Sequence, residues 1–358
     1  MKYAIRVSLA ALLVLLLAIL PGCQNEDKKS STDQTEQNVD EENLEYAYKD
    51  IICDRSIVEG KMAVYFFRSD HNLDHYTGGS LVCGDSTLLI TPNGTTMLID
   101  CNLMPNTAHI VEYLQKLGIE KLDYFMMSHC DMDHFAGYDA IVRNIEVERV
   151  LVNNYPAYTQ NDKNPVPRET EFLNAFIEKG VPYTVLKAGD KFQFGELEVD
   201  VLWPEGDVVW DTDDTQGLDR NNGSLVIRME YGESSFLFGG DVFLKAEAML
   251  VEKYGDALKT DVIKMNHHGT SISNGLEWIE ATSPLIAGAM HPYLGSENVM
   301  DMYMLNGAVP LHTTLDGTIL IYTTGDGSYD VQVEKDRTTT YWGDLGAVDG
   351  HFRVEKGE

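Results

Sequence analysis

The chain has 358 residues and a formal net charge of −30, because 57 Asp and Glu outnumber 27 Lys and Arg. A surface this acidic excludes non-specific binding of nucleic acid through a broad basic face, since that binding depends on Lys and Arg that neutralise phosphates. Any polyanionic substrate would have to be held locally, by metal ions or by a small basic patch.

Residues 1–22 are predicted to form a lipoprotein signal peptide. Lys2 and Arg6 precede an apolar stretch from Val7 to Leu20, which is shorter than the ~20 residues that a membrane-spanning helix needs. The stretch ends in Leu-Pro-Gly followed by Cys23, which resembles the lipobox of bacterial lipoproteins. We therefore expect a lipid on Cys23 and an extracytoplasmic, membrane-anchored protein. The alternative is an ordinary cleaved signal with a chance cysteine.

Residues 23–55 are predicted to form a disordered acidic tether. They are rich in charged and amide side chains and poor in apolar ones, so they cannot bury enough surface to offset the entropy of ordering. Residues 56–358 then form one folded domain. Four more cysteines lack CxxC spacing, and we interpret them as buried small side chains rather than metal ligands: Cys53, Cys83, Cys101 and Cys130.

Strands and helices alternate along the folded part. In the first half, in chain order, the pattern predicts strands Met62–Phe67, Ser86–Thr91 and Thr96–Asp100, helix Thr107–Leu117, strand Leu122–Met127, helix Ala136–Val142, strand Val147–Val152, helix Glu169–Lys179, and strands Tyr183–Leu186 and Leu197–Leu202. In the second half it predicts strands Ser224–Met229 and Ser235–Phe238, helix Phe243–Tyr254, strand Asp261–Met265, helix Leu276–Ala281, strand Leu285–Gly288, helix Asn298–Leu305, and strands Thr318–Tyr322 and Tyr329–Val333. This order indicates an α/β fold, a layered αββα sandwich with catalytic loops at one edge of its sheets.

A metal-ligand motif lies between the strand ending at Met127 and the helix starting at Ala136. It has the form HxDxDH and contains His129, Asp131, Asp133 and His134. Alternate side chains of an extended loop point the same way, so the first three converge, and the adjacent fourth can serve a second ion. Imidazole and carboxylate together favour Zn²⁺, Mn²⁺ or Fe over Ca²⁺. The alternative, a polar loop that caps a helix, would produce this pattern by chance in about one chain of this length in two thousand.

Two later strands also end in candidate ligands. Asp241 follows one of them, and His267 and His268 follow the other. Each is weak evidence alone, because Asp241 could instead cap the helix that begins at Phe243 and either histidine could be a buried structural residue. Three strand ends that carry such residues are together what a two-metal hydrolase requires.

From about Met62 to Val333 the sequence resembles the metallo-β-lactamase superfamily, in particular its ComEC-like branch. Besides the ligand motifs, the matching segments are Thr96–Asp100, Lys187–Asp190, Val201–Pro204, Asn221–Val226, His267–Ser271 and Leu315–Ile319. The resemblance implies a four-layer fold in which His129 and Asp131 hold one metal and Asp133 and His134 the other. It also implies that Asp241 bridges the ions and that His267 completes the second site, with His268 as the alternative.

The remaining site residues are expected to act on the substrate. We expect Asp131 or Asp133 to orient the attacking water and His268, His291 or Lys264 to stabilise the transition state. The expected substrate contacts are Asn221, Asn222, Ser224, Ser271 and His291.

The motif departs from that of true class B β-lactamases, which resemble HxHxDH. Asp131 stands at the second position, and no histidine occurs from 135 to 240. The first metal position is therefore rich in oxygen. We expect two divalent ions, with Zn²⁺ favoured and Mn²⁺ as its rival.

The resemblance implies hydrolysis of a phosphodiester by a nuclease or phosphodiesterase. Loss of Lys2 and Arg6 with the signal would make the charge −32, which disfavours a long polyanion. An alternative is an enzyme for cell-wall or lipid phosphodiesters, similar to phosphorylcholine esterases of the same fold. An alternative of another class is a non-catalytic binding lipoprotein, and an inactive family member is a third. No obligate protein partner is implied.

Overall fold

The computed structural model describes residues 52–69, 84–104, 106–153, 167–206, 218–291, 294–335 and 350–357. The chain separates into two units, 1–40 and 41–358, and every described residue belongs to the second. The predicted signal peptide, Cys23 and the predicted tether up to residue 51 therefore lie outside the described residues. Ile52 and Cys53, which were assigned to the tether, pack in the core of the folded unit. Within the described ranges, no helix has both the length and the apolar character needed to cross a membrane.

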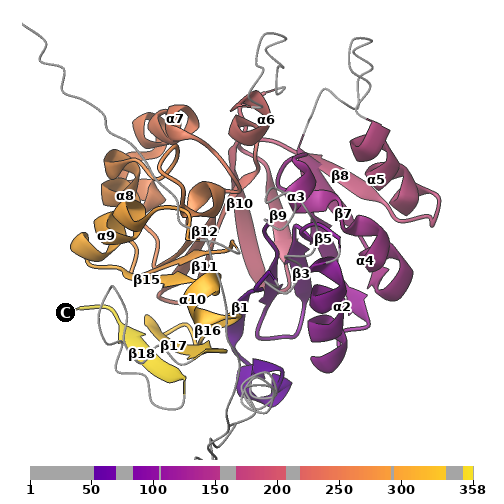
Figure 1. Ribbon diagram of the computed structural model, residues 1–358, viewed down its shortest axis with the longest axis horizontal. Coiled ribbons are helices and arrows are strands. Elements are labelled where there is room, and N and C mark those ends of the chain that lie inside the picture. The colour runs from indigo at the N-terminus through magenta and orange to yellow at the C-terminus, as the bar shows by residue number, and fades with distance from the viewer. Residues whose placement is uncertain are drawn as a thin grey trace, which may run out of the picture. The chain divides into compact units, whose positions relative to one another are not determined.

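Two mixed sheets stack face to face (Figure 1). The larger contains β1 (Met62–Phe66), β2 (Thr87–Ile90), β3 (Thr96–Ile99), β5 (Tyr124–Met126), β7 (Val150–Asn153), β8 (Tyr183–Leu186), β16 (Ile319–Thr323), β17 (Ser328–Val333) and β18 (His351–Glu355). Its strand order is β18-β17-β16-β1-β2-β3-β5-β7-β8. Strands β3, β5, β7 and β8 run parallel, and the others pair antiparallel.

The second sheet contains β9 (Lys191–Phe194), β10 (Leu197–Trp203), β11 (Val226–Tyr231), β12 (Ser234–Phe238), β13 (Val262–Lys264), β14 (Ile286–Ala289) and β15 (Val309–His312). These strands lie in the order β15-β14-β13-β12-β11-β10-β9, and β12 to β15 are parallel. A small separate sheet pairs β4 (Lys121–Leu122) with β6 (Glu146–Val147).

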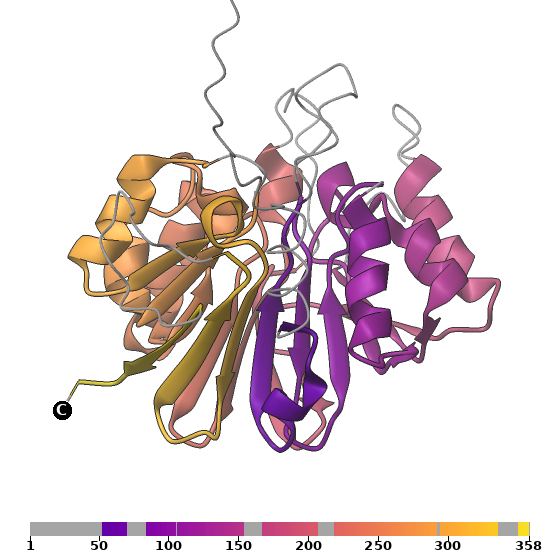
Figure 2. The same cartoon turned by 60° about the horizontal axis from the view of Figure 1, so that its bottom comes forward.

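Helices cover the outer faces of both sheets (Figure 2). The nine-stranded sheet is covered by α2 (Asn106–Lys116), α4 (Tyr138–Asn144) and α5 (Pro167–Ile177). The seven-stranded sheet is covered by α7 (Leu244–Tyr254), α8 (Leu276–Thr282) and α9 (Glu297–Leu305). Short helical segments are η1 (Arg55–Val58), α3 (Met132–Phe135), α6 (Leu218–Asn222), η4 (Gly255–Leu258), η5 (Asn266–Gly269) and α10 (Thr313–Asp316).

Alternation along each strand divides the apolar side chains among three cores. Val64 on β1 packs between the two sheets, while its neighbours Ala63 and Tyr65 pack beneath the helices of the first layer. In the same way, Phe236 on β12 faces the other sheet and Leu237 faces the second helical layer. The predicted four-layer αββα sandwich is therefore confirmed.

Several elements differ from the prediction, among them the short helices α3, α6 and α10, which were not predicted. The predicted strand Leu122–Met127 is broken at Asp123, whose carboxylate accepts a hydrogen bond of 2.8 Å from the backbone N–H of Thr96. Strands β9, β15 and β18 were not predicted. All three lie at sheet edges, and the exposed positions of β9 give it no continuous apolar pattern. Cys53, Cys101 and Cys130 are buried, as expected, and Cys83 lies outside the described residues.

Candidate metal centre

The candidate ligands gather where strands of both sheets end. Asp100 follows β3 and the HxDxDH loop follows β5, both in the nine-stranded sheet. Asp241 follows β12, and the adjacent histidines follow β13, both in the seven-stranded sheet. Because β3 runs parallel to β5 and β12 runs parallel to β13, each pair brings its following residues to one edge. The predicted convergence of three strand ends is found.

Asp100 fixes the orientation of two histidines in the loop. Its Oδ2 accepts hydrogen bonds from Nδ1 of His134 at 2.7 Å and from the hydroxyl of Ser128 at 2.6 Å. That hydroxyl oxygen lies 3.0 Å from Nδ1 of His129. Since the single hydroxyl proton goes to Asp100, Nδ1 of His129 must donate. Both rings therefore turn Nε2 toward the site, as in carboxylate–histidine–metal arrangements.

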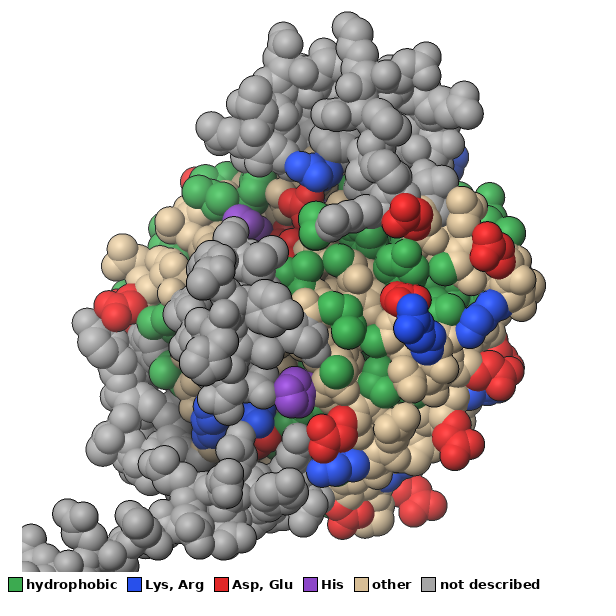
Figure 3. All heavy atoms as spheres, turned by 45° about the vertical axis from the view of Figure 1, so that its right-hand side comes forward, with side chains coloured by type: hydrophobic (Ala, Val, Ile, Leu, Met, Phe, Trp, Pro, Cys, Tyr) green, Lys and Arg blue, Asp and Glu red, His purple; other side chains and the backbone are tan. Residues whose placement is uncertain are grey.

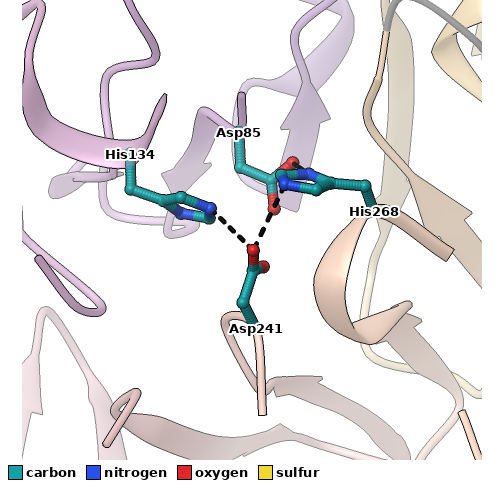
Figure 4. Close-up of side chains that lie close together, drawn as sticks. All are labelled: Asp85, His134, Asp241 and His268. Carbon is teal, nitrogen blue, oxygen red and sulfur yellow. Dashed lines mark hydrogen bonds and ion pairs between the residues drawn. The ribbon is translucent and has the colours of Figure 1, made fainter. Parts of the chain in front are cut away.

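Asp241 lies at the centre of the group. Its Oδ2 is 3.0 Å from Nε2 of His134 and 3.2 Å from Nε2 of His268 (Figure 4). Asp85 completes a buried set of four residues, whose candidate ligand atoms all lie within 4.8 Å of one another. Asp241 is not a helix cap, because the N-cap of α7 is Phe243.

His268, rather than His267, points into this group. Nδ1 of His268 lies 2.9 Å from Oδ1 of Asp85, and its Nε2 lies 3.1 Å from Oδ2 of Asp133. Nδ1 of His267 instead lies 2.7 Å from the hydroxyl of Thr270, and its ring packs edge-on against Phe243. Of the two expected candidates, the geometry therefore favours the alternative, His268, over His267 as the histidine that faces the cluster.

The charged groups of the site hold one another in their ionised forms. Burial lowers the pKa of His134 and His268. The nearby carboxylates, Asp241 for both rings, Asp100 for His134 and Asp85 for His268, nevertheless raise that pKa well above its usual range. Burial raises the pKa of Asp241, and these imidazoles together with Lys264 hold it well below its usual range. Burial and the charge of His134 lower the pKa of His129 to about 3. His129 is therefore neutral, the form that binds a metal.

Asp131 turns toward α6 at the rim of the site. Its Oδ1 lies 3.2 Å from Nε of Arg220, and its Oδ2 accepts a hydrogen bond of 3.1 Å from Asn221. Burial raises the pKa of this carboxyl group. Each carboxylate oxygen has a second lone pair, so these bonds leave Asp131 able to ligate an ion.

The other residues predicted to contact the substrate lie in different parts of the site. Ser224 accepts a hydrogen bond of 3.0 Å from the backbone N–H of Asp241, and Asn222 accepts one of 3.0 Å from that of Phe243. Both therefore hold the loop after β12. The ring centroid of His291 lies 5.2 Å from that of His268. Ser271 is exposed at the end of the histidine loop.

The donor set fits a metal ion. Nε2 of His129 is buried and has no hydrogen-bond partner among the described residues, which is costly unless a ligand satisfies it. Its ring centroid lies 4.2 Å from that of His134. Imidazole nitrogens and carboxylate oxygens facing a common point are typical of Zn²⁺ and Mn²⁺ sites.

Three charged residues of the site were not predicted as site residues: Asp85, Asp100 and Arg220. Asp100 was noted only as the end of a matching segment. The position of Asp85 could have been inferred from the hairpin of β2 and β3. In this hairpin Thr87 pairs with Ile99, so the residues before β2 and after β3 share one sheet edge. No comparable signal identifies Arg220, because α6 is short and its approach to Asp131 is a tertiary contact.

Comparisons of the sequence with known proteins identify a family. The sequence model of the metallo-beta-lactamase superfamily matches residues 81–273, more than half of the chain. ComE operon protein 3 of Bacillus subtilis (strain 168) is 28% identical over 218 residues, which cover 59% of this chain and 26% of that protein. Competence protein ComA of Neisseria gonorrhoeae is 26% identical over 241 residues, which cover 66% of this chain and 30% of that protein. This chain thus matches less than a third of either relative.

Among solved structures, CmlA, a diiron beta-hydroxylase from Streptomyces venezuelae, superposes with a TM-score of 0.45 at 15% identity, covering 71% of this chain and 53% of that one. The predicted superfamily and the resemblance to its ComEC-like branch are confirmed by the sequence matches. The chain belongs to the metallo-β-lactamase superfamily, with a buried Asp–His cluster that could hold a metal ion and a distant relationship to ComEC-like proteins.

Proposed function

We propose that this chain is a phosphodiesterase that acts through a pair of divalent metal ions. The observation that carries the proposal is the 3.2 Å contact between Nε of Arg220 and Asp131. It puts a guanidinium group, whose geometry suits phosphate oxygens, beside a candidate metal ligand. In a chain with a net charge of −30, this is the local cation that a phosphodiester needs.

The formal charges support two ions rather than one. The charged side chains of the site are Asp85, Asp100, Asp131, Asp133, Asp241, Lys264 and Arg220. When the histidines are neutral, which is the form that binds a metal, these charges sum to −5 + 2 = −3. One divalent ion would leave −1 and two would leave +1. A positive excess attracts an anionic diester, whereas a negative site repels it.

The proposed ligands are His129 and Asp131 for one ion, Asp133, His134 and His268 for the other, and Asp241 for both. Zn²⁺ is the expected metal. Mn²⁺ is its rival, because Asp131 supplies an oxygen ligand at the position where the HxHxDH motif of class B β-lactamases has a histidine nitrogen. Bound there, the ions would supply an activated water and neutralise charge on a phosphoryl oxygen.

The protein's own groups then hold the substrate and the water. Arg220 binds a non-bridging phosphoryl oxygen, because its side chain is 32% exposed and lies at the rim. Asp133 orients the attacking water, since its side chain is 21% exposed and its Oδ2 already faces the cluster. His268 acts as a ligand in this proposal and not as a proton donor.

A lipid or wall phosphodiester is the preferred substrate class. Exposed apolar side chains lie beside the histidine loop, where the backbone N–H of Leu244 donates to Ile272 at 3.3 Å and Leu276 begins α8. They would contact an apolar part of the substrate. On the face shown in Figure 3, the coloured Lys and Arg side chains are spaced among acidic ones, and no broad basic patch for a long nucleic acid is seen among them. Nuclease activity of the ComEC type is the second candidate.

We also propose that a lipid on Cys23 anchors the enzyme to the outer side of the bacterial membrane, because a short apolar stretch precedes this cysteine. Cys23→Ala should move the protein from the membrane fraction to the soluble fraction or block its processing. Wild-type protein that is already free outside the cell would contradict the anchor.

The function is tested by elemental analysis of purified protein together with a substrate panel. The panel contains bis(p-nitrophenyl) phosphate, p-nitrophenyl phosphorylcholine, single- and double-stranded DNA, and a chromogenic β-lactam. We expect metal-dependent hydrolysis of the small diesters and negligible β-lactam turnover. Hydrolysis of the β-lactam alone would overturn the assignment, and metal-free protein that binds a solute without turnover would support the binding lipoprotein.

A further inference from the structure

We infer that the buried pair of Lys264 and Asp85 positions the metal ligands Asp241 and His268, so that each presents a single atom to the ions. This inference rests on the proposed two-metal centre. It assigns two of the charged residues in the cluster to the support of its ligands and not to the ions or the substrate.

Lys264 makes all of its contacts inside the protein. Its Nζ lies 2.5 Å from Oδ2 of Asp85 and 3.2 Å from Oδ1 of Asp241. It also donates to the backbone carbonyls of Gly240 at 2.6 Å and Met265 at 3.2 Å. The side chain is only 4% exposed, and an ammonium group has three protons to donate. Lys264 therefore has no donor left for a substrate, so the expected transition-state role does not fit it.

Both carboxylate oxygens of Asp85 also contact groups inside the protein. One of its oxygens contacts Lys264, and the other lies 2.9 Å from Nδ1 of His268. Although its oxygens belong to the close-set group of four, both already have protein partners. We therefore assign Asp85 to holding His268 in the form that carries its free lone pair on Nε2.

The consequence for Asp241 follows from which oxygen Lys264 contacts. Lys264 holds Oδ1, so Oδ2 is left between Nε2 of His134 and Nε2 of His268, at 3.0 and 3.2 Å. A carboxylate without this restraint could rotate and give both oxygens to one ion. The contact with the ammonium group thus leaves Oδ2 as the oxygen that Asp241 would present to bound metal ions.

The test uses full-length protein loaded with Mn²⁺, in which magnetic coupling between two neighbouring ions is visible by electron paramagnetic resonance. The variants are Lys264→Met, Asp85→Asn and the double variant, with Lys259→Met as the control because that side chain is 64% exposed. The readouts are Mn²⁺ stoichiometry and affinity, the coupled signal, and the thermal unfolding temperature of the metal-free protein.

Lys264→Met should lower stability, because it leaves Asp85 buried without its cation. It should also lower the affinity for the second Mn²⁺ by about 10- to 100-fold and abolish the coupled signal. The double variant, Lys264→Met with Asp85→Asn, removes the unpaired charge at position 85. The amide oxygen of the new side chain can still accept a hydrogen bond from His268. The double variant should regain stability but not the coupled signal, and it carries the test if Lys264→Met does not fold.

A double variant with wild-type affinity and coupling would overturn the inference and leave Lys264 as a purely structural residue. If wild-type protein binds no Mn²⁺ and no Zn²⁺, the proposed metal centre fails as well. Two ions in wild type and in every variant would remove only the positioning role.

Discussion

Asp85 and His268 are 183 residues apart in the chain, and Oδ1 of the first lies 2.9 Å from Nδ1 of the second. This contact orients one of two adjacent histidines toward the buried Asp–His cluster. It leaves Nε2 of His268 facing Asp133 and Asp241, whereas His267 bonds to Thr270. Adjacent side chains of the same type thus have different roles because only one has a carboxylate behind it.

The first prediction compares the two histidines directly. His268→Gln should lose at least one metal ion per chain, because it removes a proposed ligand together with its contact to Asp85. Hydrolysis should therefore fall by more than 100-fold. His267→Gln should keep its metal. The two residues form a matched pair because both have left-handed backbone φ values, 44° and 58°. Elemental analysis after gel filtration measures the outcome, and equal metal content in the two variants would contradict the assignment.

The second prediction concerns Asp241. Asp241→Asn should cost more metal than any other single ligand change, because this residue is proposed to serve both ions. The matched control is Asp256→Asn, since Asp256 is 94% exposed. Titration with Zn²⁺ or Mn²⁺ and a competing chelator measures both affinities. An Asp241→Asn protein that retains two tightly bound ions would show that the carboxylate is not shared.

The third prediction concerns Arg220. Arg220→Met should raise KM for a small phosphodiester by about 10- to 100-fold, the effect of losing a charge-assisted hydrogen bond worth about 1.5–3 kcal/mol. The change in kcat should be smaller, and metal content should stay near two ions per chain. Arg143→Met is the control, because that side chain is 72% exposed on α4. An unchanged KM would remove the proposed phosphoryl contact without affecting the metal centre.

The fourth prediction concerns Glu247, which supports the histidine loop from α7. Its Oε1 accepts hydrogen bonds from the side chain of Asn266 and the backbone N–H of Asn274, and its Oε2 accepts one from Gly275. Glu247→Gln should destabilise the protein by about 1–3 kcal/mol, since its amide N–H₂ would face one of these donors. Urea unfolding of metal-free protein measures this. No change in the midpoint would show that the loop does not depend on Glu247.

The sequence predicted the part of the site that is contiguous. His129, Asp131, Asp133 and His134 share one short loop, so their spacing alone indicates a common site, although Asp131 turns toward α6 at its rim. Asp241 could be predicted because it follows the end of an apolar strand. In contrast, nothing local distinguishes His267 from His268, because the choice depends on backbone torsions and on a carboxylate that the fold brings from the start of β2.

The fold was predictable to a similar extent. Strands buried on both faces, such as β1 and β12, have continuous apolar runs and were found within one residue of their ends. Strand β9 lies at a sheet edge with alternating polar positions, and β18 follows a long segment without periodicity. Such strands are defined by the neighbour to which they hydrogen-bond, which a local pattern does not contain.

Every candidate ligand before residue 135 is attached to the nine-stranded sheet, and every one after residue 240 to the seven-stranded sheet. A metal ion bound by ligands from both sheets would link the two halves of the sandwich. Separating the sheets would then require releasing the ion, so its binding free energy adds to that of folding by mass action. At a free metal concentration 100 times Kd, that contribution is about 2.7 kcal/mol per site. Metal supply would therefore influence how much of the protein stays folded, besides how fast it turns over.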